Sequence, residues 1–374
     1  MNPFDQIGKN IRLRREAAGL TQSDLAEKLF VSFQAVSAWE RGQSVPDLEN
    51  AFRIAQLFGV SVDALLKNGD RELLVGIDGG GTKTEFVSFY EDGTVVNRVV
   101  TEGTNPNDVG ESTCIATLSE GLSRLLQGAI PKAVFAGIAG AGAGDWKHIL
   151  SKALSEKIGT TVWVDTDALC VLSLATDPEN SAMVISGTGS CVFVRRGGNL
   201  IRLGGWGQLF DESGSAYDVG KDAMRHALAV EDGLESPSLV FDKLLEKLGS
   251  PIFASIPMIY EKGRAFIASL APLVCEAVEA GDAKGIEILE KNAAHLARLL
   301  RSAKERYGAD EFLCGGGFFR NEAFRQMVAV KSDCTLLSPN LPPVCGACIE
   351  ALCRLKSPIP EDFRTNFEKS YGGL

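Results

Sequence analysis

One pattern of strand, small-residue loop and strand occurs twice in this chain, and it restricts the possible folds more than any other feature of the sequence. The first copy has a buried-strand pattern at 73–77, the loop DGGGTKT at 78–84 and strand patterns at 85–90 and 94–100. The second copy has a strand pattern at 183–185, the loop SGTGS at 186–190 and strand patterns at 191–194 and 200–203. A repeat this long indicates duplicated domains rather than a solenoid, whose repeats are roughly 20–50 residues.

Glycine loops that follow strands suggest phosphate binding, because backbone amides can approach an anion closely there. A P-loop or a Rossmann site would continue from the loop into a helix, whereas both loops here lead into a second strand. The sequence therefore disfavours these two common nucleotide folds. A third glycine run, 315–317, follows a strand pattern at 312–314 and precedes a helix pattern from about 321.

Charge is informative only when it is counted by segment. The whole chain has a net charge of −10, which argues against a protein coated in nucleic acid. Residues 1–70 hold eight Lys/Arg and nine Asp/Glu, so their own balance is −1 and DNA binding by this segment is not excluded. The 374 residues are 45% hydrophobic and 23% charged, which is typical of two or three globular domains.

Compartment follows from what the sequence lacks. No apolar run approaches the roughly 20 residues of a membrane helix, and the first residues contain no apolar signal core. The nine cysteines are an odd number, which is typical of reduced thiols rather than a disulfide framework. We therefore expect a cytoplasmic protein that does not bind membranes.

Five short helical patterns follow one another in the first seventy residues. The first stops at Gly19, Thr21 can cap the second, and Ser32 can cap the third, which runs through Trp39. A fourth opens at Pro46-Asp47 and runs through Leu57, and Ser61 can cap a last one that ends at Leu66.

Residues 5–66 resemble the lambda-repressor-like (Cro/C1, XRE) helix-turn-helix family. The matching segments are LTQ at 20–22, DLA at 24–26, VS at 31–32, VS at 36–37, WERG at 39–42, Pro46 and GVS at 59–61. The resemblance implies that 32–41 form the recognition helix of a homodimer on an operator of double-stranded DNA. It implies base contacts by Ser32, Phe33, Gln34 and Ser37, and phosphate contacts by Gln22 and Arg41. The alternative is a five-helix module that binds proteins.

The remainder of the chain resembles a second family. Between the two copies the patterns are helix 110–127, strand 133–138, helix 144–157, strand 161–166 and helix 168–175. Three strands followed by helix-strand-helix-strand-helix resemble the half-unit of the duplicated α/β actin-like ATPase (ribonuclease H-like) fold, in which ATP lies in the cleft between two halves. Residues 73–354 resemble the BadF/BadG/BcrA/BcrD ATPase family and, within it, the N-acetylglucosamine kinase branch. The carrying segments are 78–82, 103–105, 165–168, 186–190, 204–207 and 214–217. Membership of the ROK sugar-kinase and repressor family would require a cysteine-rich zinc motif, which the sequence lacks.

The resemblance to the kinase branch implies a set of site residues. Asp167 would accept the proton of a sugar hydroxyl, and Asp78 would orient a magnesium ion through water. ATP would be bound by Gly79, Gly80, Gly81, Thr82, Lys83, Gly187, Thr188, Gly189, Gly315, Gly316 and Gly317. An amino sugar would be bound by Asn105, Asp167, Gly205, Trp206, Gly207 and Glu212. Two structural alternatives stay open: Asp167 can be a helix N-cap, and Trp206 can be a core residue.

Two further segments leave alternatives open. The family pattern Gly-Asp-Glu-Gly-Ser becomes DESGS at 211–215, so the sugar-binding aspartate becomes Glu212 unless Asp211 replaces it. This departure leaves both the sugar and the turnover open. Cys345 and Cys348 form a C-x2-C motif, which could bind an iron–sulfur cluster, although we expect buried thiols on a helix of small residues.

The expected organisation is a helix-turn-helix domain at 1–68, a linker at 69–72, lobe I at 73–180, lobe II at 181–356 and a tail at 357–374 that packs back on lobe I. Three hypotheses for function follow. The chain is a sugar-responsive transcription regulator whose sensor is a working amino-sugar kinase that uses ATP and Mg. Alternatively, it is a catalytically silent sugar- and ATP-binding repressor, or an amino-sugar kinase with a helical docking module.

Overall fold

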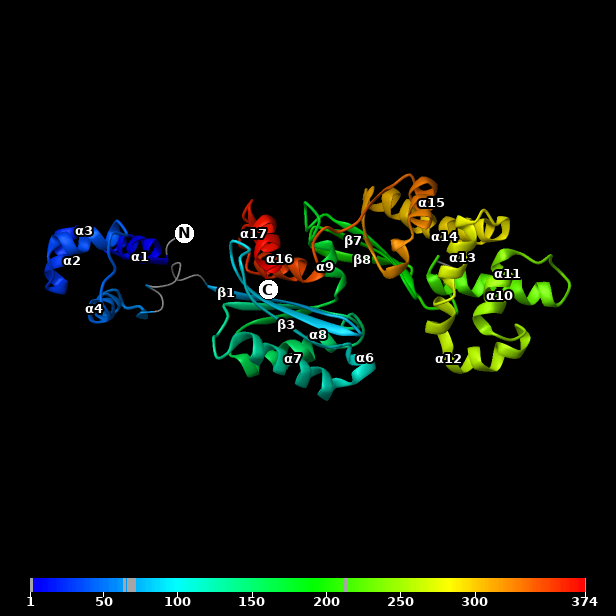
Figure 1. Cartoon of the computed structure of the whole chain (residues 1–374), viewed down its shortest axis with the longest axis horizontal. Coiled ribbons are helices and arrows are strands. Elements are labelled where there is room, and N and C mark those ends of the chain that lie inside the picture. Colours follow the sequence, from blue (N-terminus) through cyan, green and yellow to red (C-terminus); the bar gives the residue numbers. More distant parts are fainter. Residues whose placement is uncertain (1–2, 63–64, 66–71, 212–213, 374) are drawn as a thin grey trace. The chain divides into compact units, whose positions relative to one another are not determined.

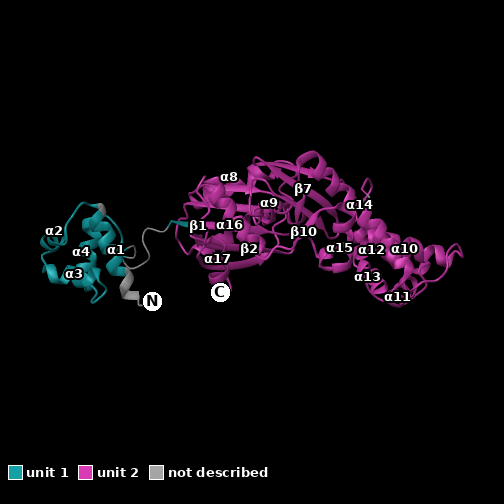
Figure 2. Cartoon of the chain, turned by 90° about the horizontal axis from the view of Figure 1, so that it is seen from above, with its two compact units in different colours: residues 1–73 teal, residues 74–374 magenta. Residues whose placement is uncertain are grey.

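The computed structural model describes residues 3–62, 65, 72–211 and 214–373, and it separates into two compact units, 1–73 and 74–374 (Figure 2). The first unit contains helices α1 (Pro3–Ala17), α2 (Gln22–Leu29), α3 (Phe33–Glu40) and α4 (Leu48–Phe58) (Figure 1). Two of the three predicted caps are confirmed, since Asp24 N–H donates to Thr21 Oγ1 (3.1 Å) and Ala35 N–H donates to Ser32 Oγ (3.2 Å). The predicted fifth helix and linker fall largely on 63–64 and 66–71, outside the described residues.

Close packing of α1 against α3 organises the first unit. A Cβ at Gly8 would lie 2.0 Å from the carbonyl oxygen of Trp39, so only glycine permits the two helices to approach this closely. Beside this contact, the Arg15 guanidinium donates to both carboxylate oxygens of Glu40, at 2.6 and 3.0 Å. The core below them is apolar and consists of Ile7, Ile11, Leu25, Ala26, Leu29, Val36, Trp39, Ile54, Ala55 and Leu65.

The second unit contains two five-stranded sheets of the same topology. The first has the order β3-β2-β1-β4-β5 and the second the order β10-β9-β6-β7-β8. In each, three antiparallel strands are followed by two strands parallel to the first of them. The strands of the first sheet are β1 (Leu73–Gly79), β2 (Lys83–Tyr90), β3 (Val95–Glu102), β4 (Ala133–Ile138) and β5 (Val162–Asp165). Those of the second are β6 (Ala182–Ser186), β7 (Ser190–Arg196), β8 (Asn199–Leu203), β9 (Glu311–Gly315) and β10 (Thr335–Leu337).

The predicted duplication is therefore present, with one difference in its first loop. The sequence predicted a loop over 78–84, but β1 continues through Gly79 and β2 begins at Lys83. The reason is that Asp78 and Gly79 pair with Gly137 and Ile138 of β4, which extends the strand beyond its apolar run.

Helices cover both faces of the first sheet (Figure 1). One face carries α6 (Pro106–Val109), α7 (Glu111–Leu126) and α8 (Trp146–Ile158), and the other carries α9 (Ala168–Leu172), α16 (Pro343–Arg354) and α17 (Phe363–Tyr371). The helix α9 ends before the predicted residue 175. The helix α16, which we expected in lobe II, packs on β4 and β2 of the first sheet.

The C-terminal tail lies against lobe I. Phe363 of α17 meets Phe89 of β2 edge to face, with ring centroids 5.9 Å apart. The Val95 N–H of β3 donates to Ser370 Oγ at 2.9 Å, and Tyr371 OH donates to Glu85 Oε1 at 2.5 Å. Through these contacts, the C-terminal helix α17 packs on β2 and β3 of the first sheet.

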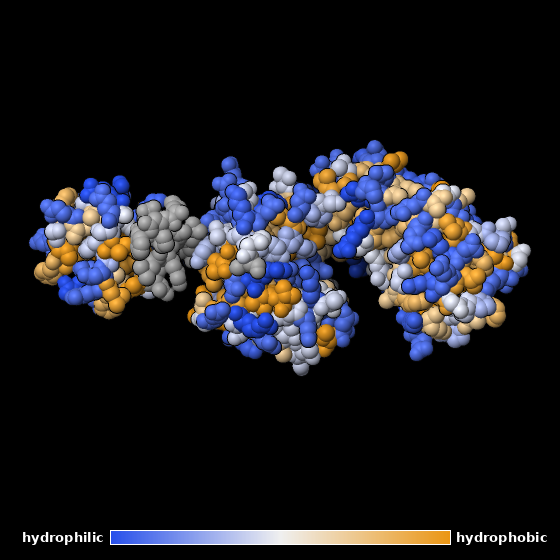
Figure 3. Space-filling view, in the orientation of Figure 1, coloured by the Kyte–Doolittle hydropathy of each residue, from blue (hydrophilic) through white to orange (hydrophobic). Residues whose placement is uncertain are grey.

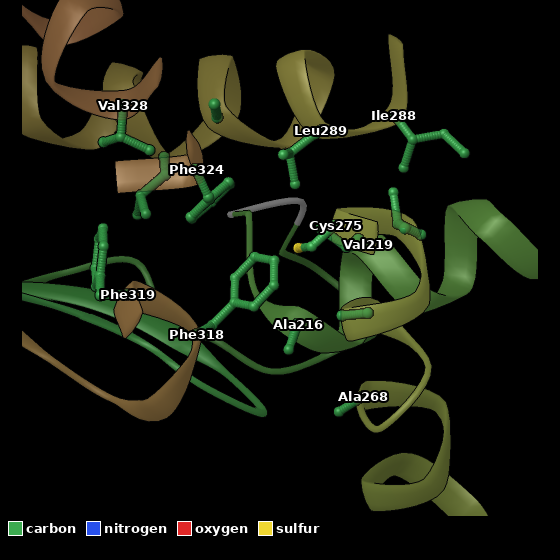
Figure 4. Packing of buried hydrophobic residues seen from close by; sticks show 14 of the residues in the cluster. Ala216, Val219, Ala268, Cys275, Ile288, Leu289, Phe318, Phe319, Phe324 and Val328 are labelled. Carbon is green, nitrogen blue, oxygen red and sulfur yellow. The ribbon is translucent and has the colours of Figure 1, made fainter. Parts of the chain in front are cut away.

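The second sheet supports a helical layer that forms the largest apolar core. Its elements are α10 (Ala216–Glu231), α11 (Leu239–Leu248), α12 (Ile256–Ala268), α13 (Ala271–Glu279), α14 (Ala283–Tyr307), α15 (Glu322–Ser332) and the 3₁₀ turns Phe253–Ser255 and Gly317–Arg320. Figure 4 shows this core, in which Phe318 and Phe324 point toward each other with ring centroids 4.5 Å apart. Such packing makes the second sheet and its helices a rigid support for the loops at the ends of the strands.

The surface is mixed in polarity. Hydrophilic and hydrophobic residues are interspersed on the visible face of each unit (Figure 3). Among the residues that the structure describes, no helix combines the length and the apolarity needed to cross a membrane.

Candidate functional site

Two carboxylates, Asp78 and Asp167, lie at the carboxyl ends of the parallel strands of the first sheet. Asp78 ends the apolar part of β1, and Asp167 follows β5 by two residues. A Cβ at Gly137 of β4, which pairs with Asp78, would lie 3.3 Å from the Cα of Asp167. The same Cβ would lie 2.1 Å from Cys170 Sγ, so a side chain at Gly137 would collide with the start of α9, which follows Asp167.

Burial acts on both carboxylates. Burial, followed by the charges of Asp167 and Glu85, raises the pKa of Asp78 from 3.8 to about 7. Burial also raises the pKa of Asp167, although hydrogen bonds from Thr166 and from backbone amides oppose this rise. Within the described ranges neither carboxylate takes part in an ion pair. The site therefore holds two acidic groups that no cation of the described residues neutralises through an ion pair.

Asp165 differs from its neighbour Asp167. Its carboxylate pairs with Lys147 at 2.5 Å and with Arg354 at 3.1 Å, so two cations already neutralise it. Asp167, in contrast, has a helical backbone (φ −55°, ψ −24°) at the start of α9 and makes no side-chain capping bond. The geometry therefore gives no support to the N-cap alternative, and the catalytic role of Asp167 stays a prediction.

The first glycine loop is held by its neighbours on both sides. Gly80 N–H donates to Lys83 O at 2.9 Å, which closes the loop, and Thr104 N–H donates to Gly80 O at 3.0 Å. A Cβ at Gly103 would lie 2.1 Å from Gly81 O, so the segment 103–105 packs directly on the loop. Thr82 and Lys83 are exposed, and Lys83 Nζ lies 3.8 Å from a carboxylate oxygen of Glu85.

Asn105 belongs to the same end of lobe I. Its amide donates to Asp108 at 2.6 Å, and its side-chain oxygen accepts from Asn107 N–H at 3.1 Å. A Cβ at Gly140, the loop after β4, would lie 2.1 Å from this oxygen. Asn105 is therefore fixed beside the loop after β4, and its role in sugar binding stays a prediction.

The second and third glycine loops lie together in lobe II. Gly187 N–H donates to Gly189 O at 2.8 Å, which closes the loop after β6. A Cβ at Gly316 (φ +87°) would lie 2.4 Å from Ser186 O, and a Cβ at Gly187 would lie 3.8 Å from the Gly316 Cα. Thr188 and Gly317 are exposed beside this contact. The predicted ATP residues of lobe II thus form one surface.

A cavity of about 310 Å³ opens beside these loops. It is lined by Ile185, Gly189, Ser190, Cys191, Gly205, Gly207, Gln208, Asp211, Ser215, Tyr217, Asp218 and Arg264. The predicted sugar turn therefore meets the predicted phosphate loop there. Burial raises the pKa of Cys191, which lines this cavity, to about 11.

Asp211 lines this cavity and is hydrogen-bonded to the neighbouring turn at Trp206, which is not a lining residue. The Trp206 side chain is 61% exposed and its ring lies 4.5 Å from the Arg202 guanidinium, so it is not a core residue. The Asp211 carboxylate accepts a hydrogen bond from Trp206 N–H. Glu212 lies outside the described residues. Arg264, which also lines the cavity, was not predicted from the sequence. The one local feature that could have indicated it is the preceding Gly263, which lies within a helix.

The cysteines of α16 are packed into the apolar layer between the two sheets. Cys345 and Cys348 are fully buried, and a Cβ at Gly76 would lie 2.7 Å from Cys348 Sγ. Burial raises the pKa of Cys345 to about 12 and raises that of Cys348 well above its usual value. Metal ligation needs thiolates, which this environment disfavours.

The helix-turn-helix face is formed by α3. Ser32, Phe33 and Gln34 are exposed, while Ser37 is half-buried. Arg41 is exposed and its Nε donates to Ser37 O at 3.1 Å. Gln22 donates its amide to Glu40 at 2.7 Å, so part of its hydrogen-bonding capacity joins α2 to α3. The predicted base and phosphate contacts remain predictions.

Comparison with known proteins agrees with both halves of the chain. The model of the BadF/BadG/BcrA/BcrD ATPase family matches residues 75–351, and a helix-turn-helix family model matches residues 11–65. An N-acetyl-D-glucosamine kinase of Dictyostelium discoideum is 27% identical over 75% of this chain and 98% of its own length. An N-acetylmuramic acid/N-acetylglucosamine kinase of Clostridium acetobutylicum is 30% identical over 62% of this chain and 79% of its own length.

The helix-turn-helix domain also has relatives, and the fold of the second unit resembles solved structures. The HTH-type transcriptional activator BcrR of Enterococcus faecalis is 38% identical over 16% of this chain and 30% of its own length. The crystal structure of a putative N-acetylglucosamine kinase from Chromobacterium violaceum superposes with a TM-score of 0.59 at 22% identity, over 75% of this chain and 99% of the other. The expected fold, a helix-turn-helix domain followed by a duplicated actin-like ATPase domain, is confirmed.

Proposed function

The chain belongs to the BadF/BadG/BcrA/BcrD ATPase family and carries a helix-turn-helix domain in residues 11–65, and on this premise we propose that it is a sugar-responsive, DNA-binding transcription regulator whose sensor is an ATP-dependent amino-sugar kinase. Its sugar-kinase-like domain and its DNA-binding domain are each established by family. The proposal concerns what the two do together: phosphoryl transfer from ATP to a sugar hydroxyl, and control of DNA binding by the sugar.

One observation carries the kinase part of the proposal. Asp167 is a half-buried carboxylate whose pKa is raised by burial, and it has no cation partner in the described ranges. Asp165, two residues away, is neutralised by Lys147 and Arg354. An unneutralised carboxylate with a raised pKa is suited to accept a proton from a bound hydroxyl, and Asp167 is the one of this pair with that property.

The residues at the first sheet fit a divalent cation. Asp78 and Asp167 are oxygen donors, the ligand type that Mg²⁺ prefers, and a cation would relieve the repulsion that raises the pKa of Asp78. We propose that Asp78 holds Mg²⁺ there, where the ion would neutralise phosphate charge. Asp167 then orients the sugar hydroxyl and takes up its proton, while Asn105 and the turn 205–207 position the sugar.

The loops fit a nucleotide. ATP use follows from family membership, and the proposal assigns its phosphates to 79–83 and 187–189 and its adenosine to 315–317. Gly316 supports this assignment because a Cβ there would collide with Ser186 O, so the bare backbones form a surface that a ligand can approach closely. Asp211 and Asp218 both line the cavity, and we assign the contact with the sugar to Asp211, the residue that can replace the aspartate of the family pattern.

The kinase is tested by a screen for ATP consumption over glucosamine, N-acetylglucosamine, N-acetylmuramate and glucose. We expect one of the amino sugars to support turnover well above the rate without sugar. Saturable sugar binding with no ATP consumption for any of them would favour the silent repressor instead. The departure at 211–215 is the observation that keeps this second function in view.

The DNA part of the proposal is a homodimer on a pseudo-palindrome whose half-sites lie about 34 Å apart. Replacing the exposed Gln34 by Ala should lower the preference for operator over random DNA by about 1–3 kcal/mol. The measurement is a titration of full-length protein on both DNAs at one salt concentration, because phosphate contacts make affinity salt-dependent. If a binding-site selection enriches no sequence, the chain is a kinase with a docking module.

The nine cysteines are all free thiols, which is typical of proteins in a reducing compartment, and we propose a cytoplasmic location.

Control of DNA binding by sugar requires coupling between the two sites. We expect operator DNA to change sugar affinity by the same factor as sugar changes operator affinity, with a coupling of about 1–3 kcal/mol. Calorimetric sugar titrations with and without saturating operator, in the presence of a non-hydrolysable ATP analogue, measure this factor. Equal sugar affinities in both conditions would leave two unconnected modules.

A further inference from the structure

A break in α12 brings an arginine to the second phosphate loop. Gly263 lies inside this helix with φ 66° and ψ −156°, a backbone conformation that side chains other than that of glycine rarely adopt. The helix direction changes there, and the next residue is Arg264. A glycine inside a helix lowers its stability, so the break needs a reason other than helix formation.

Two contacts hold the Arg264 guanidinium beside the loop 186–190. Its Nη2 donates to Thr188 O at 3.2 Å, and its Cζ lies 5.4 Å from the centre of the Tyr217 ring. A Cβ at Gly189 would lie 3.0 Å from Nη2, so the absence of a side chain at Gly189 leaves room for the guanidinium. Arg264 therefore lines the cavity between the loop and Tyr217.

The charge of Arg264 has no acidic partner among the described residues. Both carboxylates that line the cavity already have partners. Asp218 pairs with Lys221 at 3.2 Å and accepts from Ser215, and Asp211 accepts from Trp206 N–H. A guanidinium has five N–H donors, and the one hydrogen bond of Arg264 among the described residues is that to Thr188 O, while the residue as a whole is exposed.

We propose that Arg264 is a phosphate-binding residue that contacts the β- and γ-phosphates of the nucleotide beside Thr188. The inference rests on the proposed ATP-dependent function and adds a residue to it. A guanidinium presents paired donors to phosphate oxygens, and the bond to Thr188 O fixes it on the loop whose backbone amides would contact the same group. Because AMP lacks these phosphates, Arg264 would distinguish the triphosphate from AMP.

The test is calorimetric binding of AMP-PNP and of AMP to the full-length protein. We expect Arg264→Ala to weaken AMP-PNP binding by about 10- to 100-fold, the range for a hydrogen-bonded charge pair, and to leave AMP binding unchanged. Arg264→Lys should restore part of the affinity, because lysine keeps the charge without the paired donors. Since Arg264 is exposed, the melting temperature should not change.

Two further variants sharpen the test. Lys262→Ala removes an exposed positive charge two residues away, whose ammonium lies over Phe266, and it should leave both affinities unchanged. Gly263→Ala keeps the arginine but strains the break, and it should reproduce part of the loss for AMP-PNP alone.

The outcomes separate this inference from the function on which it rests. If the wild type binds AMP-PNP and Arg264→Ala binds it equally well, or loses AMP to the same extent, the assignment is wrong while the ATP site stands. If Arg264→Ala binds N-acetylmuramate more weakly but AMP-PNP as well as the wild type does, the arginine binds the carboxylate of an acidic sugar instead. The assignment to the nucleotide is then again wrong. A wild type that binds no nucleotide would overturn the ATP site and this assignment together.

Discussion

The two lobes of the second unit have the same strand topology and opposite chemistry at the ends of their strands. In lobe I, Asp78 lies in β1 just before the glycine loop, and a second carboxylate, Asp167, lies nearby. In lobe II the corresponding residue is Ser186, whose hydroxyl donates to Gly214 O at 3.0 Å. The cation beside that loop is Arg264, which lines the cavity together with Asp211 and Asp218. We call the end with Asp78 and Asp167 the acidic end, and the end where Arg264 lies on the loop the basic end.

This difference shows how two copies of one fold can carry different chemical groups and so serve different parts of one reaction. A backbone hydrogen bond closes each loop, although over different lengths: Gly80 N–H donates to Lys83 O, and Gly187 N–H donates to Gly189 O. The side chains around the loops then assign different tasks: a proton acceptor and metal ligand on one side, phosphate binding on the other.

The largest expected effect tests the acidic end. If the domain is a kinase, Asp167→Asn should reduce turnover by about 10²- to 10⁴-fold, the usual contribution of a general base. Sugar binding should survive, because the amide fills the same space and can form hydrogen bonds. Turnover and sugar affinity are measured on the same preparation. The matched control is Asp165→Asn, which removes a carboxylate already paired with Lys147 and Arg354. An equal loss of rate in the control would show that Asp167 has no special role.

The second prediction concerns the electrostatic strain of the acidic end. The pKa of Asp78 is raised from 3.8 to about 7, chiefly by burial, so the native state binds the proton more tightly than the unfolded chain. Stability from this group is therefore present at low pH and is lost as the pH rises from about 4 to 7. At about 1.4 kcal/mol per unit of pKa, Asp78→Asn should stabilise the metal-free protein above pH 7 by up to about 4 kcal/mol.

Denaturant unfolding of the metal-free protein at pH 4 and pH 8 measures this effect. We expect little difference between Asp78→Asn and the wild type at pH 4, and a gain for the variant at pH 8. Asp145→Asn, which removes an exposed carboxylate of the same lobe without a capping bond, is the control. A gain of the same size at both pH values would contradict the electrostatic explanation.

The smallest expected effect tests the basic end. Gly316→Ala places a Cβ 2.4 Å from Ser186 O at a backbone φ of +87°, so it should destabilise the contact between the two lobe II loops by about 1–3 kcal/mol. Nucleotide affinity should fall with it. Gly142→Ala in lobe I, where no atom lies within 4 Å of the added Cβ, should leave both quantities unchanged. Equal melting temperatures for the two variants would contradict the close approach of the loops.

Local patterns in the sequence were sufficient for much of the fold and for part of the site. Thr21 and Ser32 were predicted as helix caps and form them, because a cap is decided by residues within one turn. The order of strands and glycine loops was also predicted. Asp78, Asp167, Asn105 and the turn 205–207 were selected through family resemblance, and the structure brings each of them to the end of a sheet or to the cavity beside it.

Other features depend on contacts that no local pattern encodes. Arg195 of β7 and Glu350 of α16 form a buried ion pair across 155 positions of sequence. The pair joins lobe II to α16. We had assigned this helix to lobe II from the sequence, but it packs on the first sheet. Arg264 reaches Thr188 across 76 positions. The neutralisation of Asp165, which distinguishes it from Asp167, comes from Lys147 and from Arg354 far along the chain.

The sequence by itself determined the helix caps, the alternation of strands and helices and the positions of the glycine loops, since each follows from hydrogen bonds and side-chain packing among neighbouring residues. Only the tertiary structure decided which carboxylate stays without a cation and which arginine lies beside the phosphate loop. Those properties depend on burial and on charges brought together from distant segments. Burial and distance are set when the sheets and helices pack, and not by the order of residues along the chain.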